Sequence, residues 1–257
     1  MKKEDVLKYS QQIISFISDE EYNVANGFFV IYNEFRYFIT ANHAITYDEI
    51  GESKPFEEVY LILHINGQEL TTKAIKLSNW QTIDLYKFIQ TECIFPRMEL
   101  DEIEDVVFCS IYPSILKGSI KELPFRLKDA QPNSCNKKEI YSIPLSDDII
   151  TPNAENNYYL AGKILQEFTF CIREYVEYFY ENIKFIDKEG KFYMFKMPTH
   201  ISMENIRGLS GAPIFDGQKN CIGMAIKYRP DDDTLIVLPI EEIIFYLKNY
   251  CTPDSEY

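Results

Sequence analysis

The chain has 257 residues, 46% of them hydrophobic and 15% aromatic, which is enough to bury a sizeable core and excludes an intrinsically disordered protein. Its 40 acidic side chains against 26 lysines and arginines give a net charge of -14 at pH 7. An acidic surface repels phosphate groups, which argues against nucleic acid and anionic membranes as partners.

Targeting and metal-binding signals are missing from the sequence. The first 20 residues lack the continuous apolar stretch of a secretory signal peptide, and no apolar run approaches the roughly 18 residues of a membrane-spanning helix. The six cysteines are scattered, with no C-x-x-C pair and no histidine at zinc-binding spacing. We therefore expect reduced thiols, a cytoplasmic location, and neither a metal ion nor another cofactor.

Helical patterns mark the two ends of the sequence. Apolar side chains recur at helical spacing over residues 4–18, so we expect an amphipathic N-terminal helix within residues 1–20. Near the other end, Pro239 precedes IEEIIFYLKN, in which Glu241 and Glu242 lie in the first turn and a lysine lies near the end. Proline at the start, acids in the first turn and a late base favour a terminal helix.

Between these ends, short apolar and aromatic runs such as GFFVIY, RYFITA and CIGMAIKY alternate with turn signals such as N-G and R-P-D-D-D. Many short strands without intervening helices are typical of an antiparallel barrel or sandwich. The aromatic stretch 173–183 fits either a strand or a helix. The sequence therefore predicts an all-β fold with terminal helices. The loop-rich stretch 131–157 separates two groups of strands, which indicates two barrels. Residues 21–130 would form a first antiparallel β-barrel and residues 131–257 a second.

Two segments carry the residue types of serine-based acyl transfer: FITANHAI around His43 and RGLSGAPIF around Ser210. In that chemistry a serine hydroxyl gives its proton to an imidazole as it attacks, and backbone N–H groups stabilise the developing oxyanion. In a G-x-S-G turn, the N–H groups of Gly208 and Ser210 would be the donors, and Gly211 would allow a close backbone approach. A G-x-S-G stretch alone also occurs in many ordinary turns.

The pairing of T-A-N-H at 40–43 with a later G-L-S-G-A-P at 208–213 resembles the trypsin/chymotrypsin-like serine peptidases, and more closely their compact bacterial, HtrA-like members. The resemblance covers roughly residues 24 to 250. It implies a chymotrypsin-like double β-barrel and a His-Asp-Ser triad that cleaves peptide bonds through an acyl-enzyme. A protein or peptide substrate is then the expected partner.

The acid of such a triad has two candidates, since the family places it at the start of an apolar strand. Asp84 lies in IDLYKFI, 41 residues after His43, a spacing usual for the family. Asp105 begins DVVFCSI, 62 residues after His43, and its strand is apolar throughout. We favour Asp105 for that reason, and Asp84 remains the alternative.

The resemblance also implies a substrate pocket, with Glu204 at its base and Ile226, Lys227 and Tyr228 lining it. An acid at the base would pair with a substrate lysine or arginine and predicts cleavage after basic residues. A shallow pocket in which Lys227 neutralises Glu204 is the competing interpretation.

Leu209 stands where self-activating members of the family have an aspartate that captures a freed N-terminus. Activation of that kind is therefore not expected, and control by a protein activator becomes a candidate. The sequence thus predicts a cytoplasmic serine endopeptidase. The alternative is a catalytically silent binding or scaffold module on the same fold.

Overall fold

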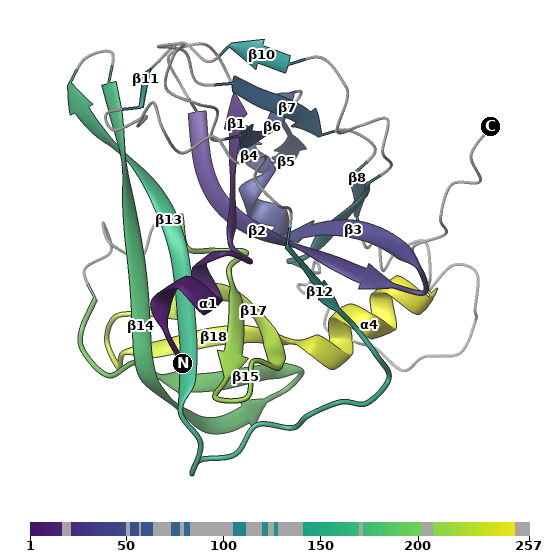
Figure 1. Ribbon diagram of the computed structural model, residues 1–257, viewed down its shortest axis with the longest axis vertical. Helices are drawn as coiled ribbons and strands as arrows, with labels where there is room; N and C mark the ends of the chain where they lie inside the picture. Colours follow the sequence, from purple (N-terminus) through teal and green to yellow (C-terminus); the bar gives the residue numbers. More distant parts are fainter. Residues whose placement is uncertain are drawn as a thin grey trace.

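The computed structural model describes residues 1–16, 22–49, 52–56, 58–63, 73–77, 80–82, 105–111, 120–122, 126–127, 141–169, 172–201 and 208–249. Within these ranges the chain forms two β-barrels of mainly antiparallel strands, with one helix near each end of the chain (Figure 1). The helices in the described ranges are α1 (Lys3–Leu7), the 3-10 turn η1 (Asn42–Ala44) and α4 (Ile240–Asn249). None of the described helices has the length and apolarity to cross a bilayer.

The first barrel is built on a sheet of nine described strands, in the order β10-β7-β6-β1-β2-β3-β9-β8, with β12 paired in parallel to β2. The strands are β1 (Gln11–Phe16), β2 (Tyr22–Tyr32), β3 (Phe35–Thr40), β6 (Glu58–Leu63), β7 (Lys73–Leu77), β8 (Trp80–Thr82), β9 (Val107–Ser110), β10 (Ile120–Glu122) and β12 (Ser142–Pro144). A separate hairpin, β4 (Thr46–Glu49) with β5 (Glu52–Pro55), follows η1.

The second barrel closes on itself, which leaves its main strands without a free edge. Its order is β11-β14-β13-β16-β17-β18-β15, and a further pairing of β14 with β15 completes the ring. The strands are β11 (Arg126–Leu127), β13 (Tyr158–Thr169), β14 (Ile172–Glu189), β15 (Phe192–Lys196), β16 (Pro213–Asp216), β17 (Cys221–Arg229) and β18 (Thr234–Pro239). The ambiguous stretch 173–183 is therefore strand.

The apolar core is continuous between the two halves. One cluster of buried side chains fills the second barrel. A larger cluster joins the first sheet to α4 and to Phe215, Met224 and Leu238 of the second sheet. The helix α4, which was expected from the sequence, thus packs its buried face into a core that it shares with the first barrel.

The predicted N-terminal helix over residues 4–18 is wrong from Lys8 to Phe16, and its last two residues lie outside the described ranges. Residues Gln11–Phe16 form strand β1, which pairs with β2 on one side and β6 on the other. All six side chains of β1 are buried, because the strand lies inside the sheet and is covered on both faces. Pairing within the sheet overrides the helical spacing of the apolar residues, which is a weaker local preference.

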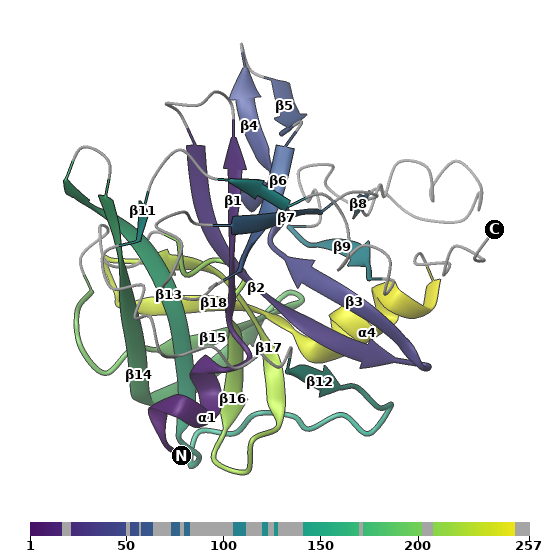
Figure 2. The same cartoon turned by 45° about the horizontal axis from the view of Figure 1, so that its top comes forward.

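The predicted boundary at residues 130 and 131 does not separate the barrels cleanly. Strand β11 precedes it but pairs with β14 of the second sheet, and β12 follows it but pairs with β2 of the first. After β12, the chain runs past the turn between β16 and β17 to reach β13 (Figure 2). Each half thus contributes one short strand, β11 or β12, to the sheet of the other half. No pattern of residues in the sequence indicates this exchange.

Candidate active site

The pairing of β3 with β9 brings His43 and Asp105 together where β3 ends and β9 begins. Thr40, the last residue of β3, pairs with Val107, the first residue of β9. Because the two strands are antiparallel, η1 after β3 and the residues just before β9 lie side by side. His43 lies in η1, three residues beyond Thr40, and Asp105 lies two residues before Val107.

The Asp105 carboxylate holds His43 at two points. The backbone N–H of His43 donates to Oδ1 at 2.9 Å, and the ring Nδ1 lies 2.6 Å from Oδ2. A carboxylate only accepts, so Nδ1 carries the proton and Nε2 of the neutral ring is left as an acceptor. The His43 side chain is 49% exposed and that of Asp105 25%, so the imidazole is open to an incoming ligand.

Ser210 lies in a turn between two glycines in the left-handed region, Gly208 (φ 87°) and Gly211 (φ 84°). A Cβ atom at Gly211 would lie 1.9 Å from the carbonyl oxygen of Asn26 and 2.7 Å from Oγ1 of Thr40. Glycine is therefore required both for its backbone angle and for the close approach of β2. Since Thr40 is three residues before His43, this contact brings the Ser210 turn against the end of β3, the strand that leads to His43.

The backbone N–H groups of this turn fall into two sets, one bonded within the protein and one without an acceptor among the described residues. The N–H groups of Gly211 and Ala212 donate to Ala225 and Leu209, at 2.8 and 3.0 Å. The N–H groups of Gly208 and Ser210 have no acceptor within the described residues, and both turn residues are partly exposed. Among the described residues, nothing competes with a ligand for these two donors beside the serine hydroxyl.

The hydroxyl of Ser210 donates to the carbonyl oxygen of Ile226 at 3.1 Å. Within the described part of the chain, it makes no hydrogen bond to His43. A hydroxyl has one proton to donate, so a bond from Ser210 to His43 requires the bond to Ile226 to break. Hydrogen bonds of this type are often absent from ligand-free sites and form when a substrate is bound.

The three strand residues predicted to line a pocket have different surroundings. Ile226 is buried and supplies the carbonyl oxygen beside Ser210, whereas Lys227 is exposed. The Tyr228 side chain is buried, and its hydroxyl donates to Asp233 at 2.7 Å and accepts from the N–H of Ile201 at 3.1 Å. The pocket remains a prediction, because Glu204 lies outside the described residues, as does the alternative acid Asp84.

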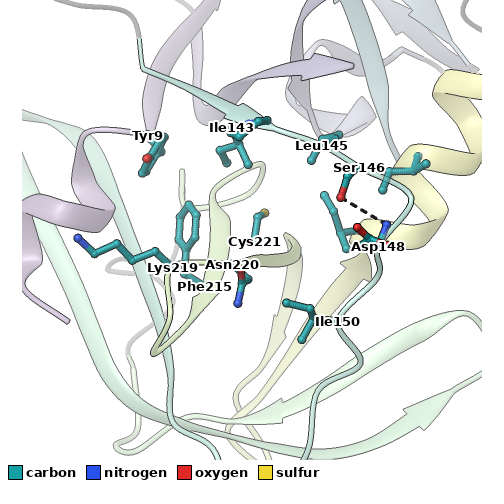
Figure 3. Close-up of a pocket in the computed structure, with 13 residues that line it drawn as sticks. Tyr9, Ile143, Leu145, Ser146, Asp148, Ile150, Phe215, Lys219, Asn220 and Cys221 are labelled. Atoms are coloured by element: carbon teal, nitrogen blue, oxygen red, sulfur yellow. Dashed lines mark hydrogen bonds between the residues drawn. The ribbon is translucent and has the colours of Figure 1, made fainter. Parts of the chain in front are cut away.

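Figure 3 shows a cavity of about 180 Å³, and neither His43 nor Ser210 is among the residues that line it. It is enclosed by the end of β12, the turn between β16 and β17, and α4, and its lining includes Cys221. Burial raises the pKa of the Cys221 thiol to about 12, and its S–H group donates to the carbonyl of Gly223 at 3.6 Å. The thiol is therefore protonated at neutral pH, and Cys221 is a poor nucleophile.

Metal ligands do not gather in the described part of the chain, where no three histidine, cysteine, aspartate or glutamate side chains form a group that could hold an ion. Sequence reasoning did miss Asn26, which contacts the Ser210 turn from β2. Its only local signal is the dipeptide Asn-Gly, which ordinarily indicates a turn.

The chain matches no protein-family model and no curated protein sequence. Among solved structures, it is similar to an inactivated protease paralogue of the scabies mite, with 9% identity, 96% of this chain and 95% of that chain covered, and a TM-score of 0.54. A protein named GrC matches with 11% identity, coverage of 95% and 94%, and a TM-score of 0.54. A serine endoprotease from Yersinia pestis matches with 10% identity, coverage of 97% and 66%, and a TM-score of 0.51.

These similarities establish the class of fold. The chain has the chymotrypsin-like double β-barrel fold of the trypsin-like peptidases, which confirms the expected architecture. Because one of the matched proteins is described as inactivated, the fold alone does not define an activity.

Proposed function

We propose that the protein is a serine endopeptidase with Ser210 as nucleophile, His43 as general base and Asp105 as the acid that orients the histidine. The observation that carries the proposal is the two-point contact of Asp105 with His43, which fixes the tautomer that can accept a proton at Nε2. The glycine-flanked turn at Ser210, packed against the same strand end, supports it.

In the proposed reaction, Ser210 Oγ attacks the carbonyl carbon of the scissile bond while its proton moves to Nε2 of His43. The N–H groups of Gly208 and Ser210, which have no acceptor among the described residues, donate to the oxyanion that forms. When the tetrahedral intermediate collapses, the C–N bond breaks, and the leaving amine takes the proton from His43. Water then hydrolyses the acyl-enzyme by the same route in reverse.

The substrate would be a protein or peptide, and the cell compartment the cytoplasm. We propose cleavage after lysine or arginine, on the basis of Glu204 in the sequence. Lys227 is exposed and is the residue that would neutralise Glu204 in the shallow-pocket alternative. Fluorogenic peptides that vary only in the residue before the scissile bond separate the two. Preference for arginine supports the acidic pocket, and equal or better turnover of alanine or leucine contradicts it.

A silent scaffold module is the second candidate, favoured by one observation. The Ser210 hydroxyl donates to the carbonyl of Ile226 instead of His43. If that state persisted with substrate bound, the serine would not be activated. A protein activator that rotates Ser210 toward His43 would reconcile this contact with catalysis.

Labelling with a fluorophosphonate probe tests the proposal directly, because the probe reacts with an activated serine. We expect the wild-type chain to be labelled, Ser210→Ala to be inert, and Asp105→Asn to be labelled about 10⁴-fold more slowly because the histidine tautomer is disturbed. Ser146→Ala, which removes an exposed serine elsewhere, is the control. A folded wild-type chain that stays unlabelled, including in lysate that supplies activators, rejects the peptidase and favours the scaffold.

A further inference from the structure

Asn26, on β2, is completely buried and uses every hydrogen-bonding group of its side chain. Its Oδ1 accepts from Oγ of Ser10 at 2.7 Å and from the N–H of Lys163 at 3.2 Å. Its Nδ2 donates to the carbonyl of Lys163 at 3.0 Å and to the carbonyl of Gly208. An asparagine side chain has two donors and two main acceptor positions, so this one is saturated.

The backbone of Asn26 is engaged as well. Its N–H donates to the carbonyl of Ser210 at 2.9 Å, and its carbonyl accepts from Oγ1 of Thr40 at 2.7 Å. One residue therefore joins the turn that carries Ser210, the strand end that leads to His43, and Lys163 on β13 of the second barrel. Such a residue decides where these parts lie relative to one another.

We propose that Asn26 is a positioning residue that holds the turn from Gly208 to Ser210 in the geometry needed for oxyanion binding, and that Ser10 completes this support. The proposal rests on the function proposed above for Ser210. Asn26 binds the carbonyl groups of Gly208 and Ser210, while the N–H groups of the same two residues are left without an acceptor among the described residues.

Glycine at position 208 makes this support necessary. A glycine can adopt several backbone conformations at little cost, so the orientation of Gly208 has to be imposed from outside. The bond from Asn26 Nδ2 supplies that constraint on its carbonyl. The space needed for the arrangement comes from Gly162 on β13, where a Cβ would lie 2.3 Å from Leu209 and 3.2 Å from Asn26 Nδ2.

The N-terminal segment, residues 1–10, contributes through Ser10, which is itself completely buried. Helix α1 packs against β13 in both views of the molecule (Figures 1 and 2), and Val6 is fully buried there. The ion pair of Asp5 with Lys219, at 3.1 Å, ties the same helix to the turn after β16. The segment thus holds Ser10 against Oδ1 of Asn26.

The substitution Asn26→Asp tests the donor at nearly constant shape, because it places an oxygen where Nδ2 faces the carbonyls of Gly208 and Lys163. We expect kcat to fall about 100-fold, the size of effect seen when one oxyanion donor is lost, with KM changed less than threefold. Ser10→Ala removes only one hydrogen bond to Asn26, and we expect kcat to fall about fivefold. Wild-type kcat in both variants overturns the proposal.

Tyr158→Phe is the matched control for a purely structural effect. Tyr158 is also buried, and its hydroxyl makes two hydrogen bonds to the backbone of Asn153, outside the Ser210 turn. We expect this variant to lose thermal stability to an extent similar to Ser10→Ala while its kcat stays at the wild-type value. An equal loss of kcat in Tyr158→Phe and Ser10→Ala would show that Ser10 acts only through stability and would overturn the proposal.

A second readout keeps the proposal separate from the peptidase function. Backbone amide signals of Gly208 and Gly211 in ¹⁵N NMR spectra report the geometry of the turn whether or not Ser210 reacts. If the wild-type chain is inert to the probe, the proposed function fails. Even then, positioning by Asn26 is supported if the signals are displaced or broadened in Ser10→Ala and Asn26→Asp but unchanged in Tyr158→Phe. Unchanged signals in Ser10→Ala and Asn26→Asp overturn it, and Ser10→Ala alone decides if Asn26→Asp does not fold.

Discussion

Two roles of glycine can be separated by comparing Gly211 with Gly190. Both have a positive φ, but a Cβ at Gly190 would meet nothing within 4 Å, whereas one at Gly211 would collide with the carbonyl of Asn26. We expect Gly190→Ala to cost about 1–2 kcal/mol of unfolding free energy from the backbone conformation alone. Gly211→Ala should cost about 2–5 kcal/mol, because overpacking adds to it.

Urea denaturation of the two variants measures this difference in unfolding free energy. Equal losses would mean that β2 moves away from the turn at no cost. In that case the contact of Asn26 with the Ser210 turn would be a weak constraint. We expect Gly211→Ala also to lose fluorophosphonate labelling, and Gly190→Ala to keep it.

The raised pKa of the Cys221 thiol makes the free energy of unfolding fall as the pH becomes alkaline. Burial raises its pKa from 9.0 to about 12 in the folded chain, so the unfolded thiol ionises first. The neutral thiol contributes its full stabilisation below pH 9, and this contribution is lost as the pH rises from 9 toward 12. We expect Cys221→Ala to lose less unfolding free energy than wild type between pH 8 and pH 10.5, measured by urea denaturation. Parallel losses in both chains would contradict the assignment to Cys221.

At the residue scale, the sequence favoured Asp105 over Asp84, and the role of Asp105 as the triad acid stays a prediction. Asp105 was preferred because its strand is apolar throughout, and strand β9 indeed places its carboxylate on His43. Asn26 was missed because its role depends on four segments that meet only in the folded chain. No pattern within the dipeptide Asn-Gly distinguishes a buried, saturated asparagine from a turn residue.

Among the elements, α4 offers a test of the core that joins the two barrels. Ile243 is fully buried in the shared cluster, while Phe245, two residues later, is 48% exposed. We expect Ile243→Ala to cost about 2–5 kcal/mol of unfolding free energy because it leaves a cavity. Phe245→Ala, on the outer face, should cost less than about 1 kcal/mol. Chemical denaturation followed by circular dichroism measures both, and similar costs would mean that α4 is only loosely attached.

Helices and strands could be predicted only where the sequence carried a local signal for them. The C-terminal helix was visible because a proline precedes it, acids lie in its first turn and a lysine lies in its last turn. Strand β1 was mistaken for helix because Ile13 and Ile14 are buried on opposite faces of one strand, which removes the alternation that identifies a half-buried strand. Strands β11 and β12 are two and three residues long and carry no period at all.

At the scale of the whole molecule, the shared core predicts cooperative unfolding of the two barrels. The single tryptophan, Trp80, lies in the first sheet, with its ring centroid 6.2 Å from that of Phe38. We expect its fluorescence to change at the same urea concentration at which β15–β18 of the second barrel lose hydrogen-exchange protection. Two separated transitions would contradict a common core.

Fold class could be predicted because its evidence is spread over the whole chain. Short strands with turns between them indicated an all-β fold, and the order of the His43 and Ser210 motifs indicated a double barrel. The seam between the barrels was not predictable, since it depends on which strand pairs with which. Strand β12, for example, lies beside β2, more than a hundred residues earlier in the chain.

The position of α4 has a consequence for the growing chain. Synthesis proceeds from the N-terminus, so the first sheet leaves the ribosome before the helix that completes its core. Tyr246 of α4 lies in the same buried cluster as Tyr32 of β2, a residue made more than two hundred positions earlier. Until α4 has been synthesised, the apolar surface that it covers is exposed to water, where it can aggregate or bind a chaperone. Ser210 and strand β16 after it also come late, so an unfinished chain holds His43 and Asp105 without the proposed nucleophile.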